Sequence, residues 1–177
     1  MIRKLSQFCN VQALKMAYYA FFYSHLTYGI EIWGNTFKRN INKLFILQKK
    51  ALRAMAGIGY RESCKDKFTE LSIMTVPSII IYKTLTMMHS SKHLISSELH
   101  HYNTRNSENI VPKKLTSRSY TLATLSLGPK LWNKLPIKFR KLPLKKFKIQ
   151  LSSFLLNYPF YEVDEFFQIS SSLSQYC

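Results

Sequence analysis

Acidic side chains are scarce in this chain of 177 residues, which has only 9 Asp and Glu against 26 Lys and Arg. Its only aspartates, Asp66 and Asp164, lie far apart in the sequence. A metal-dependent polymerase or nuclease needs carboxylates clustered around two cations, which clamp the attacking and leaving oxygens. Glu162, Asp164 and Glu165 do crowd together, but beside aromatic residues near the chain end they are more typical of a solvated acidic turn. We therefore expect no catalytic residues of this class.

Cysteine and glycine are also sparse, and their spacing excludes several kinds of site. Cys9, Cys64 and Cys177 are odd in number and widely separated, with no CxxC pair. They predict no disulfide framework and fit a reducing, intracellular compartment, either nuclear or cytoplasmic. The 5 glycines are too dispersed to form a phosphate-binding loop, so we expect no cofactor.

The 5 histidines give only a weak signal for a metal site or a catalytic base. His89 and His93 stand four residues apart, but the HExxH zinc motif would need a glutamate where the chain has Ser90. Cys64 could pair with His25 or His89 as nucleophile and base, and nothing in the local sequence supports that pairing. A buried thiol and surface imidazoles are the simpler interpretation, so we expect no bound metal.

No hydrophobic run near the start of the chain is long enough to span a membrane. The charge-free stretch at residues 16–30 is shorter than the roughly 20 residues that a membrane-spanning helix needs, and it contains His25. With 46% hydrophobic residues, the chain can instead bury a real core. This stretch is better interpreted as a core helix.

What the sequence has in excess is positive charge, with a formal net charge of +17. Residues 38–53 hold six basic residues and residues 109–161 hold eleven, with no carboxylate in either segment. A surface kept soluble by lysine is the plainer interpretation. However, segments of this length whose charges are all positive repel themselves unless a bound anion neutralises them. We favour binding to a polyanion, with nucleic acid first and an acidic membrane surface second.

The pattern of apolar and turn residues predicts a mainly α-helical fold. Asn10 can cap a helix whose apolar residues keep helical spacing as far as Gly29. Pro77 suits the first turn of a helix that runs to about His89. The three isoleucines at 79–81 are β-branched and would equally suit a buried strand, and we favour the helix.

The second half of the chain predicts two shorter helices, near residues 127–135 and 144–156. Residues 90–118 are rich in Ser, Asn, His and Lys with weak periodicity, which predicts a loop or linker. The expected organisation is a helical region at residues 1–89, this linker, and a basic helical segment at residues 119–177.

The clearest helix is expected over residues 40–57. At about 100° per residue, its apolar face carries Ile41, Leu44, Phe45, Leu52 and Met55. Its opposite face carries Lys43, Lys49, Lys50 and Arg53. Gln48 lies near the middle of the apolar face, where a buried amide must find hydrogen-bond partners. We therefore expect Gln48 to tie two elements together.

Aromatic and basic residues are interleaved beyond residue 100, at Tyr102, Arg105, Tyr120, Trp132, Phe139 and Phe147. Basic side chains neutralise phosphates, and aromatic rings can stack on bases. The same aromatic rings could equally form a hydrophobic core, and for Trp132 we favour the core.

Four blocks of the sequence, in order, resemble the carboxy-terminal region of jockey-like non-LTR retrotransposon reverse transcriptases. They are AYYAFFYSHLTYGIEIWG at residues 17–34, LFILQKKALRAMAG at 44–57, HYNTRNS at 101–107 and GPKLWNKLP at 128–136. In that family these blocks look like the thumb and the segments beyond it, downstream of the palm. The resemblance covers most of the chain and implies a thumb-like helical bundle followed by a smaller helical segment.

The chain also departs from that family, because it contains no FADD-like motif of the palm and no amino-terminal endonuclease domain. No catalytic residue can therefore be carried over. The resemblance implies that Lys43, Lys49, Lys50 and Arg53 lie in the thumb, which in polymerases contacts the template and primer duplex. Arg105 lies in the HYNTRNS block, where an exposed turn and a phosphate contact are equally good interpretations.

Together these observations predict a non-catalytic part of an RNA-directed DNA polymerase that binds RNA, DNA or a hybrid duplex. Candidate contacts are Lys43, Lys49, Lys50, Arg53, Arg105, Lys113, Lys114, Lys145 and Lys146. The catalytic part of a reverse transcriptase is a second candidate partner. Two alternatives stay open: a co-opted, independent nucleic-acid-binding protein, and an interaction module that docks on a separate catalytic subunit.

The scarcity of carboxylates predicts that the purified chain will not extend a primer on an RNA template with magnesium or manganese. An extension assay with a known reverse transcriptase as positive control tests this. Extension that persists after repeated purification would contradict the prediction.

Overall fold

A computed structural model of the chain describes residues 2–30, 38–91, 108–111, 127–169 and 173. Helices dominate these residues, so the expected mainly α fold is confirmed. None of the helices in the described ranges is long and apolar enough to cross a membrane. The elements in chain order are α1 (Ile2–Leu5), α2 (Val11–Ala17), η1 (Tyr18–Tyr23), α3 (Ser24–Thr27), α5 (Lys38–Ala56), α6 (Lys65–Glu70), α7 (Val76–Ser90), α10 (Gly128–Lys134), α11 (Ile137–Arg140), α12 (Leu144–Asn157) and α13 (Glu165–Ile169).

The first expected helix forms and is capped as predicted. The side-chain oxygen of Asn10 accepts a hydrogen bond from the backbone N–H of Ala13 at 2.9 Å, which satisfies a donor at the start of α2. The chain then widens into the π-helix η1 and returns to α-helix in α3. Gly29 follows with a positive φ of 63°, a conformation that glycine adopts without a steric penalty.

Helix α5 also follows the prediction, beginning at Lys38 and ending just before Gly57. Gly57 has φ +65°, the left-handed conformation that commonly terminates a helix. On the predicted apolar face Phe45, Leu52 and Met55 are buried, and its remaining members, Ile41 and Leu44, pack against the same core.

Helix α7 starts with two local signals. Thr75 accepts a hydrogen bond from the backbone N–H of Ser78 at 3.2 Å, and Pro77 occupies the first turn. The three isoleucines at 79–81 are buried in this helix, so the helical interpretation is confirmed. Their burial outweighs the weak β preference of their branched side chains, because propensity yields to tertiary packing.

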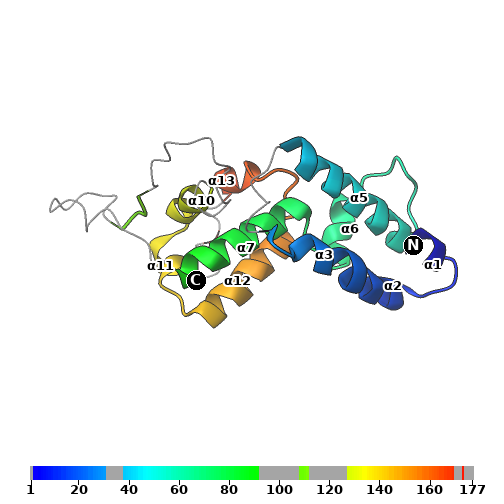
Figure 1. The fold of residues 1–177 in the computed structure, drawn as a ribbon, viewed down its shortest axis with the longest axis horizontal. Coiled ribbons are helices and arrows are strands. Elements are labelled where there is room, and N and C mark those ends of the chain that lie inside the picture. The colour runs from blue at the N-terminus through cyan, green and yellow to red at the C-terminus, as the bar shows by residue number, and fades with distance from the viewer. Residues whose placement is uncertain (1, 31–37, 92–107, 112–126, 170–172, 174–177) are drawn as a thin grey trace.

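Helix α7 is shared by two hydrophobic clusters. Ile79 and Ile80 belong to the cluster formed with α2, η1, α5 and α6, whereas Ile81 and Leu85 belong to the cluster formed with α10, α11, α12 and α13. Figure 1 shows α7 and α12 side by side, with α2, α5 and α6 toward one end and α10 and α11 toward the other. The expected division at residues 1–89 and 119–177 stays a prediction, since α7 packs into both clusters.

Gln48 ties three segments together at the centre of the first cluster and is fully buried. Its amide nitrogen donates to the Tyr18 hydroxyl at 2.8 Å and to the Met74 carbonyl at 2.7 Å. Its amide oxygen accepts from the backbone N–H of Val76 at 2.9 Å. Burial raises the pKa of the Tyr18 phenol, although the Gln48 contact opposes this shift. The expectation that Gln48 connects elements is confirmed.

A second buried hydrogen bond links the start of α7 to the segment after α12. The Thr75 hydroxyl donates to the Phe160 carbonyl at 2.6 Å while it also caps α7. Thr75 is fully buried, so this bond is shielded from water. It connects residues that are 85 positions apart in the sequence.

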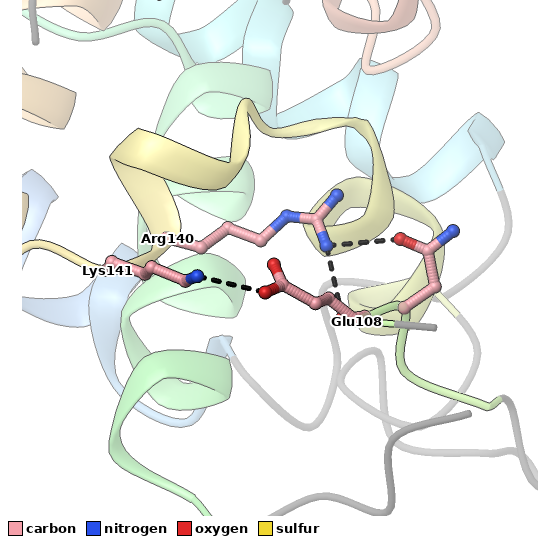
Figure 2. Close-up of polar contacts among 4 residues, drawn as sticks. Glu108, Arg140 and Lys141 are labelled. Carbon is pink, nitrogen blue, oxygen red and sulfur yellow. Dashed lines mark hydrogen bonds and ion pairs between the residues drawn. The ribbon is translucent and has the colours of Figure 1, made fainter. Parts of the chain in front are cut away.

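Within the expected loop at residues 90–118, the structure describes only residues 90, 91 and 108–111. Asn133 holds Ile110 by two hydrogen bonds of 2.9 Å, one to its N–H and one to its carbonyl. Figure 2 shows Arg140 and Lys141 reaching toward Glu108, with the Lys141 ammonium 2.9 Å from its carboxylate. Residues 108–111 are therefore pinned against α10 and α11.

We expect Gln48→Leu to lower the free energy of unfolding by about 2–4 kcal/mol, because it strands the Met74 carbonyl and the Val76 N–H without partners. Urea unfolding measures the change. Asn42→Leu, an exposed substitution on the same helix, is the control and should shift stability by less than about 0.5 kcal/mol. Equal unfolding midpoints for Gln48→Leu and the wild type would contradict the structural role of Gln48.

Candidate nucleic-acid interface

The four cations predicted on α5 fall into two groups. Lys43 and Lys50 are exposed. Lys49 is half-buried, and its ammonium lies 4.5 Å from the centre of the Phe45 ring and 5.3 Å from that of Tyr161. A cation over aromatic faces is stabilised by their quadrupoles. Lys49 therefore contributes to packing as well as to surface charge.

Arg53 is half-buried and holds the loop that follows α5. Its guanidinium donates two hydrogen bonds to the Glu62 carbonyl, at 3.1 Å from Nε and 3.0 Å from Nη2. The Glu62 carboxylate in turn accepts from the backbone N–H of Gly59 at 2.8 Å. These contacts fix residues 57–62 against the end of α5.

Arg39 is a further exposed cation on this helix, and the prediction from sequence omitted it. Arg39, Lys43 and Lys50 fall within about 40° of one another around the helix, at 100° per residue. They extend over about 16 Å of its length, at 1.5 Å per residue. We call these three residues the α5 strip. Arg39 belongs to the basic run at residues 38–53, so helical spacing applied to that run would have placed Arg39 on the same face as Lys43 and Lys50.

At its carboxy-terminal end, α5 borders a groove of about 830 Å³ formed with α1, η1 and residues 57–60. Its lining is mostly apolar and includes the exposed rings of Phe21 and Tyr60. Arg3, Lys50 and Arg53 also line it, and no carboxylate is among the lining residues that the structure describes. We call this feature the aromatic groove. Because Lys50 belongs to both features, the α5 strip leads directly into the groove.

The remaining predicted cations lie elsewhere or outside the described residues. Lys145 and Lys146 are exposed on α12, far in sequence from the α5 strip, with the exposed side chain of Ile149 on the same side of the helix. Arg105, Lys113 and Lys114 lie outside the described residues, as does the HYNTRNS block.

Two of the aromatic residues proposed for base stacking are core residues instead. Phe139 and Phe147 are fully buried and pack edge to face, with ring centres 5.1 Å apart. Trp132 contacts Phe147 at 5.9 Å, so the core interpretation that we favoured for Trp132 is confirmed. Helices α11 and α12 bury the rings of Phe139 and Phe147 in the cluster that includes α7, so these rings cannot stack on bases. Tyr102 and Tyr120 lie outside the described residues.

Among the described residues, His25 is exposed, as expected for a surface imidazole, but the expectation is wrong for His89, which is half-buried and packs into the fold. His89 lies with its Nε2 2.8 Å from the Leu142 carbonyl and its ring 4.6 Å from Phe147, so it joins α7 to the start of α12. Cys64 is buried, as expected, with its sulfur 3.8 Å from the Tyr161 hydroxyl. Burial first, and this contact second, raise the pKa of Tyr161.

The acidic segment near the end of the chain makes a local contact. The Glu165 carboxylate accepts a hydrogen bond from the backbone N–H of Tyr161 at 3.3 Å, as an acidic residue in the first turn of α13 can do. In the described part of the chain, no three His, Cys, Asp or Glu side chains are grouped to hold a metal ion. His93 is outside that part.

We expect Arg53→Gln to destabilise the protein by about 1 kcal/mol, because the charged hydrogen bonds to the Glu62 carbonyl are lost at a partly exposed position. Trypsin cleavage after Arg61 should also become faster as residues 57–62 loosen. Lys50→Gln on the same helix is the matched control and should change neither quantity. Identical behaviour of the two variants would show that Arg53 does not hold this loop.

Comparison with known proteins assigns no family to this chain. No protein-family model, no curated protein and no solved structure matches it. The candidate interface is therefore defined by its geometry and its charge.

Proposed function

We propose that this protein binds nucleic acid through the α5 strip, as a non-catalytic part of a jockey-like reverse transcriptase. The observation that carries this proposal is the alignment of Arg39, Lys43 and Lys50 on one exposed face of a 19-residue helix. Three exposed cations on one helix face can neutralise phosphates of a nucleic-acid backbone. The four sequence blocks that resemble the thumb and the segments beyond it support the placement within a reverse transcriptase.

The position of the strip also supports binding. Its helix is held from behind by Gln48 and by the buried face of Phe45, Leu52 and Met55, so the exposed cations project from a supported surface. The backbone of a packed helix is already ordered, so only its side chains lose conformational freedom when it binds a rigid duplex. Phosphate contacts of this kind carry little sequence information, so binding should be nearly indifferent to base sequence.

The test is a binding titration on duplex DNA and on an RNA–DNA hybrid at several salt concentrations. The triple variant Arg39→Gln, Lys43→Gln, Lys50→Gln should bind more weakly, and its salt slope on duplex DNA should fall by about 0.9 for each lost phosphate contact. Circular dichroism should show an unchanged helix content, because these side chains are exposed.

A charge-matched control separates a specific interface from net charge. Lys130, Lys134 and Lys138 are exposed lysines of α10 and α11, and their replacement by Gln removes the same charge from the other end of the molecule. Equal weakening by both triple variants would show that no interface is centred on α5. Tight binding to anionic phospholipid vesicles with none to nucleic acid would instead identify a membrane surface as the partner.

A further inference from the structure

The aromatic groove combines exposed aromatic rings with small residues. Phe21 and Tyr60 leave 56% and 73% of their surfaces exposed, whereas the other groove residues include the small residues Ala54, Gly57 and Gly59. Small residues keep the groove open, and the exposed rings offer flat faces. A planar, partly apolar group fits such a surface.

The charged side chains that line the groove, among the residues that the structure describes, are all cations. Arg3 and Lys50 are exposed, and Arg53 is anchored by the Glu62 carbonyl. The nearby Glu62 carboxylate accepts a hydrogen bond from the Gly59 N–H. A negative charge beside the apolar part of an occupant would complement the cations of Arg3 and Lys50. A nucleotide has this combination, because its base stacks on aromatic rings while its phosphate pairs with cations.

A nucleotide and an acidic amphipathic peptide are both candidate occupants of the aromatic groove, and the position of the α5 strip favours one of them. Arg39 and Lys43 lie along α5 away from the groove, and Lys50 lies at its edge. A nucleic-acid backbone that follows the strip would bring its next nucleotides to the groove. A short peptide helix confined to the groove would not reach Arg39 and Lys43, so the alignment of these two cations with Lys50 favours a nucleic-acid strand.

We propose that the aromatic groove binds an unpaired nucleotide at the single-stranded end of a nucleic acid whose backbone lies along the α5 strip. The base lies against Phe21 and Tyr60, and its phosphates contact Lys50 and Arg3. This inference rests on the proposed function, and it adds a preference for duplexes with an overhang over blunt duplexes.

The experiment compares two DNA duplexes of identical sequence, one blunt and one with a short single-stranded overhang that carries a fluorescent purine analogue. The wild type should bind the overhang substrate about 5-fold to 150-fold more tightly, the range that one stacked base contributes. It should also quench the fluorescence of the analogue. Tyr60→Ala and Phe21→Ala should each lose most of this preference and leave binding to the blunt duplex unchanged.

Phe8→Ala is the matched control, because Phe8 is an aromatic residue with 86% of its surface exposed and does not line the groove. It should keep the preference for the overhang. Equal affinity of the wild type for both duplexes would overturn the groove proposal while leaving the α5 strip intact.

The remaining outcomes are also decisive. Absence of binding to either duplex would overturn the proposed function and, with it, the groove proposal. If an acidic amphipathic peptide bound the groove in a manner that depends on Tyr60 while the purine fluorescence stayed unquenched, the groove would be a protein-docking site and the nucleotide proposal would be wrong.

Discussion

The hydrogen bonds of Gln48 are the constraint on which the first hydrophobic cluster depends. A buried amide costs free energy unless its donors and its acceptor are satisfied, and here Tyr18, Met74 and Val76 satisfy them together. Because these partners come from η1 and from the start of α7, one side chain sets where α5 lies relative to both. The position of α5 in turn places the α5 strip and one wall of the aromatic groove.

Helix α7 connects the first hydrophobic cluster to the rest of the molecule. Its isoleucines pack into both clusters, and Thr75 at its start bonds to the Phe160 carbonyl beyond α12. A helix with apolar residues on most of its circumference needs neighbours on several sides, which explains its central place. At the far end, Arg140 and Asn133 hold residues 108–111 through backbone carbonyls and N–H groups, so specific hydrogen bonds supplement hydrophobic packing there.

The basic residues divide into those that hold the fold and those that remain on the surface. Arg53 and Arg140 use their guanidinium groups on backbone carbonyls, and burial lowers the pKa of Arg140, with Glu108 opposing that shift. Arg39, Lys43 and Lys50 remain exposed. A run of basic residues in a sequence does not indicate which of these roles each residue takes. The guanidinium group of arginine can donate hydrogen bonds to backbone carbonyls as well as to phosphate. Only the positions of the carbonyls decide which role each arginine takes.

The sequence by itself determined what depends on near neighbours: the Asn10 cap, the end of α5 at Gly57, the first turn of α7 at Pro77, and the burial of Gln48 on an apolar face. These follow from helical periodicity and from hydrogen bonds that span a few residues. The tertiary structure alone decided the partners of Gln48, the burial of Phe139 and Phe147, and the gathering of Arg3, Phe21 and Tyr60 around one groove. Those contacts join residues far apart in the chain, and no local pattern specifies which distant surfaces pack together.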